Sequence, residues 1–153
     1  MLRTRTCSAL ALFLALGCLG WLALAPTPGA AQVGFIVIVD GSSSVESVTK
    51  ADLVKIFMRR TARWSDGSSV KPVDQHPSSA VRDAFSKAVH GRSTEAVVSH
   101  WRQQIFAGRA VPPPERKGDA AVVSYVSKNR GAVGYVGPGT ALGSAKPLSV
   151  RGL

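Results

Sequence analysis

The pattern of apolar residues beyond position 33 predicts short strands that alternate with amphipathic helices. Residues 34–40 (GFIVIVD) are apolar and β-branched, and Asp-Gly and three serines close the run, which is typical of a buried strand. Thr49 then precedes a stretch in which Leu53, Ile56 and Phe57 recur at helical spacing, so Thr49 is expected to cap a helix.

Residues 70–74 (VKPVD) predict a second strand. Its Pro72 indicates an edge position, because proline has no N–H to donate to a neighbouring strand. Three helices are expected after it: one from about residue 80 to Gly91, one capped by Ser93 or Thr94, and one capped by Asp119. The residues expected to face inward from these helices are Val81, Phe85, Ala88, Val89, Val98, Trp101, Ile105, Val122, Val123 and Val126.

Residues 132–136 (AVGYV) and 147–150 predict the last two strands. Strands and helices alternate, the connections are short, and no internal repeat is visible. The expected class is therefore α/β, with helices that flank a small mixed sheet.

The first 31 residues have the composition of a secretory signal peptide. Arg3 and Arg5 form a basic start, an uncharged apolar run follows over residues 8–25, and small residues precede the expected cut after Ala31. The run is also close to the length of a spanning helix, and residues 15–18 (ALGC) resemble a lipoprotein box, so an uncleaved anchor and a lipidated form are the alternatives. The cleaved reading leaves residues 32–153 as one domain and predicts an extracytoplasmic, periplasmic location.

Both cysteines, Cys7 and Cys18, lie inside this leader. The expected mature chain therefore has no disulfide, thiol nucleophile or thiolate metal site. The three histidines lack the spacing of a zinc site, and no metal or cofactor is predicted. Asp74, His76 and Ser78 lie close in sequence, but they occur without a nucleophile-elbow motif, so a nucleophile–base pair and an enzymatic function are not predicted.

Removal of the leader takes away two arginines and no acid. It leaves 17 Lys and Arg against 9 Asp and Glu, a net charge of +8. Such a surface attracts anionic ligands, protein partners or lipid headgroups, although it also serves solubility alone. The cations are scattered without interleaved aromatic residues, so nucleic-acid binding is not predicted.

Two serine-rich loops follow the first two predicted strands and are the candidate ligand-binding segments. A helix start offers unpaired N–H groups, serine hydroxyls add donors, and the Arg82 fork suits phosphate-like oxygens. These features together describe an oxyanion cradle; the alternative is that the serines are simple caps and Arg82 is a solvated surface residue. The candidate residues are Ser42, Ser43 and Ser44 in the first loop, and Ser78, Ser79 and Arg82 at the second loop and the following helix.

Several segments resemble the phosphate-type substrate-binding proteins of bacterial ABC transporters. They are residues 52–74 (DLVKIFMRRTARWSDGSSVKPVD), the loop and helix start HPSSAVRDAF, the helix WRQQIFAGR and the ending VVSYVSKNRGAVGYVG. The resemblance covers roughly residues 35–140. It implies one lobe of a periplasmic-binding-protein type II fold that binds phosphate or a similar oxyanion without catalysis, with Ser78, Ser79 and Arg82 at the grip.

The chain departs from this family in two respects. A full binding protein closes two lobes over its ligand, and the mature chain is long enough for about one. The grip also reads Pro-Ser-Ser-Ala, without the glycine that allows close approach to phosphate. A homodimer would supply the missing wall, and an ABC permease or another envelope protein is the expected partner. The alternative is an envelope accessory protein that keeps the lobe without high-affinity ligand binding.

Overall fold

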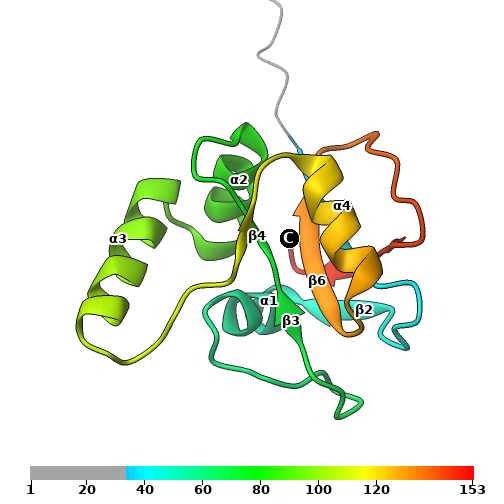
Figure 1. Ribbon diagram of the computed structural model, residues 1–153, viewed down its shortest axis with the longest axis horizontal. Coiled ribbons are helices and arrows are strands. Elements are labelled where there is room, and N and C mark those ends of the chain that lie inside the picture. The colour runs from blue at the N-terminus through cyan, green and yellow to red at the C-terminus, as the bar shows by residue number, and fades with distance from the viewer. Residues whose placement is uncertain (1–33) are drawn as a thin grey trace, which may run out of the picture. The chain divides into compact units, whose positions relative to one another are not determined.

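The computed structural model describes residues 34–153, which form a mixed α/β domain (Figure 1). The predicted signal peptide and its alternatives lie outside the described residues. The strands are β1 (Ile36–Val39), β2 (Ser47–Thr49), β3 (Lys71–Pro72), β4 (Asp74–Gln75), β5 (Glu115–Arg116), β6 (Ala132–Val136), β7 (Lys146–Pro147) and β8 (Ser149–Arg151). The helices are α1 (Lys50–Phe57), α2 (Ala80–Phe85), the π-helical turn η1 (Ser86–His90), α3 (Thr94–Phe106) and α4 (Asp119–Lys128). The predicted class, a small mixed sheet with flanking helices, is confirmed.

A four-stranded sheet in the order β3-β6-β1-β7 forms the centre of the domain. β1 runs antiparallel to both of its neighbours, with Ile36 opposite Val136 and Ile38 opposite Pro147, whereas β3 runs parallel to β6. The edge position of β3 agrees with the expectation from Pro72. Two short parallel pairs, β2 with β8 and β4 with β5, extend the framework.

Alternation along β1 divides the core between the two faces of the sheet. Val37 and Val39 pack with α1, α2 and Trp64 on one face. Ile38 packs on the other face with Val122 and Val126 of α4. Gly134 permits this second contact, because a Cβ there would lie 2.7 Å from a methyl group of Val122. The residue without a side chain in β6 thus lets α4 lie directly on the sheet.

The local predictions for α1 are confirmed. Thr49 has extended backbone angles and accepts a hydrogen bond from the Asp52 N–H, as an N-cap should. Leu53, Ile56 and Phe57 are buried. The helix therefore forms where its cap and its apolar face were predicted.

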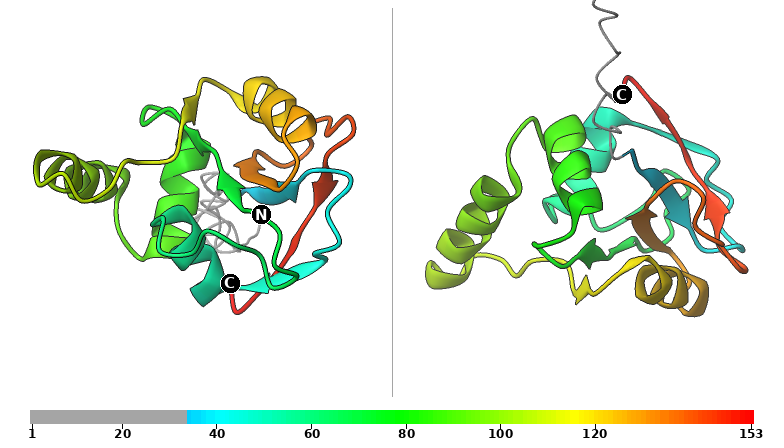
Figure 2. Two further views of the ribbon diagram at one scale, coloured as in Figure 1. Left: turned by 60° about the horizontal axis from the view of Figure 1, so that its bottom comes forward. Right: turned by 90° about the horizontal axis from the view of Figure 1, so that it is seen from above.

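The later helices differ in detail from the expectation. α4 has Gly118 rather than Asp119 as its N-cap residue, and Asp119 is the first residue of the helix. In α3, Ser93 caps and Trp101 is buried as expected, but Ile105 is 53% exposed, so its predicted inward position is wrong. The buried residues of α3, Thr94, Val97 and Trp101, lie in its first part, and the helix lies at the outer edge of the domain (Figures 1 and 2), so the later Ile105 remains exposed.

Within residues 34–153, no helix combines the length and the apolar character that crossing a bilayer would need.

Candidate functional site

The two serine loops lie at opposite ends of the central sheet. Ser42, Ser43 and Ser44 follow β1, which is antiparallel to β6, so they lie near the beginning of β6. The loop after β4 lies near the end of β6, since the Gln75 amide donates to the Tyr135 carbonyl at 3.0 Å. Because the sheet is mixed, the carboxyl ends of its strands do not share one edge. The structure does not bring the two loops together in one cradle.

We call the residues Asp74, Gln75, Ser78, Ser79, Arg82 and Glu115 the helix-start region. Ser79 is the N-cap of α2: its hydroxyl accepts from the Arg82 N–H at 3.4 Å and donates to the Gln75 side-chain oxygen at 2.6 Å. Ser78 is exposed and its hydroxyl lies 2.8 Å from His76 Nδ1. The first two amides of α2, those of Ala80 and Val81, have no acceptor among the described residues. The turn therefore keeps two amide donors free for an acceptor from solution.

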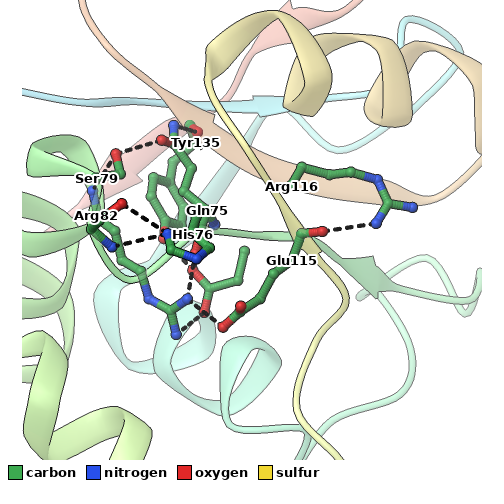
Figure 3. A network of polar contacts seen from close by, with 9 residues as sticks. Gln75, His76, Ser79, Arg82, Glu115, Arg116 and Tyr135 are labelled. Carbon is green, nitrogen blue, oxygen red and sulfur yellow. Dashed lines mark hydrogen bonds and ion pairs between the residues drawn. The ribbon is translucent and has the colours of Figure 1, made fainter.

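Arg82 does not join these donors at the surface. Its side chain is 2% exposed and forms ion pairs with Asp74 at 3.1 Å and Glu115 at 2.7 Å (Figure 3). It also donates to the Gln75 carbonyl, and its buried Nε has no partner among the described residues. The guanidinium charge is thus already matched by two carboxylates of the chain.

Burial controls the protonation of this cluster. Asp74 is buried, and desolvation raises its pKa despite the opposing effects of Arg82 and the Tyr135 hydroxyl. Burial, followed by the Asp74 charge, raises the pKa of Tyr135, which therefore remains a hydrogen-bond donor. The cluster shows the features of a structural ion-pair network that ties β4 to β5 and α2.

Asp119 anchors the same end of the sheet, a role that sequence reasoning did not anticipate. Its carboxylate accepts from Gln75 Nε2 at 2.7 Å, from the Gly137 N–H at 3.0 Å and from the Thr140 hydroxyl at 2.8 Å. Glu115, Gln75 and Tyr135 were likewise not predicted as members of the site. Several of their contacts join residues more than 30 positions apart, for which no local pattern gives a signal.

The first serine loop lines a hollow of about 390 Å³, which we call the serine groove. Its lining residues are Asp40, Ser42, Ser43, Ser44, Asp66, Ser68, Ser69, Lys71, Arg130 and Gly131. Asp40 is buried; one of its oxygens accepts from the Ser42 N–H at 3.1 Å, and the other accepts from the Gly131 N–H at 2.8 Å. Ser44 donates to Asp66 at 2.5 Å, which joins the loop after β1 to the turn before β3.

Comparisons with known proteins support the fold. No family model matches the sequence, and no curated relative matches it. Among solved structures, a phosphate ABC transporter substrate-binding protein with bound phosphate from Clostridium perfringens superposes with a TM-score of 0.62 at 21% identity, over 79% of this chain and 46% of that one. An ABC-type phosphate transport receptor from Vibrio cholerae gives 0.61 at 18% identity, over 78% and 47%.

A phosphate-binding protein from Stenotrophomonas maltophilia matches with a TM-score of 0.55 at 20% identity, over 79% of this chain and 40% of that one. The chain thus spans less than half the length of each of these proteins. The predicted resemblance to phosphate-type substrate-binding proteins is confirmed at the level of the fold, as one lobe.

Proposed function

We propose that this chain is an exported, non-catalytic binding protein for phosphate or a similar small oxyanion. The observation that carries the proposal is the likeness of its fold to one lobe of proteins named as phosphate-binding, combined with free amides at the start of α2. Ser78 and the amides of Ala80 and Val81 would contact the anion. Ser79 would stabilise the turn through its hydrogen bond to the Gln75 side chain. Arg82 would be a positioning residue, because its buried guanidinium donates to the Gln75 carbonyl and does not reach the anion.

The electrostatics of the helix-start region limit the expected affinity. Arg82 is matched by Asp74 and Glu115, so the anion gains from neutral amide and hydroxyl donors rather than from a free guanidinium. A single lobe also leaves one side of the ligand in water, where charge-assisted bonds are weaker. A second copy of the chain or an ABC permease would close that side, in keeping with an extracytoplasmic location after cleavage of residues 1–31.

The amide donors can be tested one at a time. Ala80 is the first residue of α2, a position that favours proline, and Ser79 already has the extended angles that a following proline requires (φ −77°, ψ 128°). Ala80→Pro therefore removes one free N–H without breaking the helix. In calorimetric titration with inorganic phosphate we expect binding to weaken by about tenfold, the usual value of a hydrogen bond to a charged group.

Lys50→Pro is the matched control, because Lys50 is the first residue of α1 and its cap is also extended. It should leave phosphate affinity within about twofold of the wild type. Equal loss in both variants would show a general effect on stability and would contradict a site at α2.

A second function is favoured by the burial of Arg82. If that arginine serves only the ion-pair network, the chain is an envelope interaction protein that has kept the lobe without high-affinity ligand binding. Absence of heat with millimolar phosphate and with sulfate, from a chain that gives a dispersed NMR spectrum, would favour this second function.

A further inference from the structure

The acidic groups of the serine groove each accept three hydrogen bonds from donors of the chain itself. Asp40 accepts the hydroxyl and the N–H of Ser42 and the N–H of Gly131. Asp66 accepts the hydroxyls of Ser44 and Ser68 and the Ser68 N–H, and these hydrogen bonds lower the pKa of Asp66 to about 2. Both carboxylates therefore act as ties between loops and have their hydrogen-bonding capacity largely filled.

The basic groups of the groove are not engaged in this way. Lys71 and Arg130 line the hollow from the start of β3 and the turn before β6, and neither forms an ion pair within residues 34–153. Lys146 lies behind the loop and donates to the Ser43 carbonyl at 2.5 Å. The hollow thus has two cations without an acceptor among residues 34–153, and a third cation supports its wall.

Hydroxyl donors add to these cations. Ser42, Ser44 and Ser68 each use their single proton on a carboxylate. The Ser43 hydroxyl instead accepts from the Val45 N–H at 3.2 Å, which leaves its own proton free. The hydroxyl of Ser69, which lines the hollow, has no hydrogen-bond partner among the described residues. Two cationic side chains and two hydroxyl protons of the groove therefore remain available to an acceptor from solution.

The walls of the groove are held in position by the backbone. Gly131 has a φ of 79°, and a Cβ there would lie 2.1 Å from the Ser69 carbonyl, so the turn that carries Arg130 lies directly against Ser69. The Lys71 N–H donates to the Gly131 carbonyl at 2.9 Å. The two cations thus project from backbone segments that are hydrogen-bonded to each other.

We propose that the serine groove is a second anion site, which binds a small polyvalent oxyanion such as a pyrophosphate or phosphomonoester group. Two cations and two free hydroxyls match several charged oxygens, and a hollow of about 390 Å³ falls in the usual range of small-molecule sites, about 300–1,000 Å³. The site lies at the opposite end of the sheet from the helix-start region. It does not depend on the proposed function.

NMR titration of the exported chain with pyrophosphate tests the assignment. We expect shifts of the amides of Ser43, Ser44, Ser69, Lys71 and Gly131, whereas a ligand at the helix start would shift those of Ser78 to Val81. The double variant Lys71→Gln/Arg130→Gln should weaken pyrophosphate binding by about tenfold or more. Arg60→Gln/Arg151→Gln is the control. It removes the same charge from two exposed residues that form no ion pair within the described part of the chain, and it should change the affinity by less than about twofold.

Three results would overturn the second site: unshifted groove amides at millimolar pyrophosphate, equal weakening in both double variants, or shifts confined to Ser78–Val81. The last result would still support the helix-start site. Shifts confined to the groove would support the second site and would count against the proposed function at α2.

Discussion

The helix-start region and the serine groove contain the same kinds of residue, serines beside carboxylates and an arginine, in opposite surroundings. At the helix start, Arg82 is buried and forms ion pairs with two carboxylates. In the groove, the carboxylates accept hydrogen bonds from serine hydroxyls and backbone N–H groups, and Arg130 remains exposed. The difference is that the guanidinium of Arg82 is paired with carboxylates, whereas Arg130 forms no ion pair within residues 34–153 and can meet an anion from solution.

The largest expected effect is the loss of Arg82. Arg82→Met would leave the buried Asp74 without its cation, and the partly exposed Glu115 would lose the same partner. We therefore expect the free energy of unfolding to fall by about 3–5 kcal/mol in urea denaturation. Arg130→Met should change it by less than about 0.5 kcal/mol. Similar losses in the two variants would remove the distinction between the two regions.

A second test uses pH and His90. Burial, with smaller effects of Arg82 and Arg92, lowers the pKa of His90 to about 4 from 6.5. Between pH 6.5 and pH 4, His90 therefore binds a proton in the unfolded chain but not in the folded chain. The free energy of unfolding should fall as the pH drops through this range, by up to about 3 kcal/mol. His90→Leu should remove this loss in denaturation series at pH 7.5 and pH 4.5.

The raised pKa of Asp74 acts in the opposite direction, because its protonation favours the folded state as the pH falls. The difference between His90→Leu and the wild type cancels this contribution. Parallel stability curves for the two proteins would contradict the assignment to His90.

Asp40 gives a smaller effect, confined to the groove. Asp40→Ala would leave the amides of Ser42 and Gly131 without their acceptor, at an expected cost of about 2 kcal/mol in the free energy of unfolding. Hydrogen exchange of the Gly131 amide should accelerate more than that of the Gly137 amide, which Asp119 holds at the other end of β6. Uniform acceleration of both amides would indicate global destabilisation instead.

The smallest effect concerns Ser44. Its hydroxyl is the main cause of the low pKa of Asp66, so Ser44→Ala should raise that pKa from about 2 towards 3.8 in a carboxyl NMR titration. Stability should change by less than about 0.5 kcal/mol, because both side chains are exposed. Ser43→Ala is the matched control, since Ser43 has no bond to Asp66, and it should leave the titration unchanged.

Much of the fold was predictable because its signals are local. Three such signals are the Thr49 cap, the apolar face of α1 and the apolar run of β6. Each depends only on residues that lie a few positions apart in the sequence. The exposed position of Ile105 was not predictable from periodicity, since it depends on which part of α3 the rest of the domain covers.

The candidate site was predictable only in part, for a related reason. Ser79 was expected at a helix start, and it caps one. Whether the Arg82 guanidinium is paired or free depends in part on Glu115, which lies 33 positions away in the sequence. The parallel pairing of β4 with β5 brings Glu115 next to Arg82. The strand β5 follows three prolines and is only two residues long, so no pattern in the sequence predicts it.

The pairing of β2 with β8 bears on the order in which the fold is completed. Residues 47–49 lead directly into α1, with Thr49 as its cap, yet their partner strand consists of residues 149–151, far away in the sequence. Such a contact closes a loop that contains nearly the whole domain, and it forms only after the intervening segments have assembled. We therefore expect this two-stranded pair to be completed late when the unfolded domain refolds.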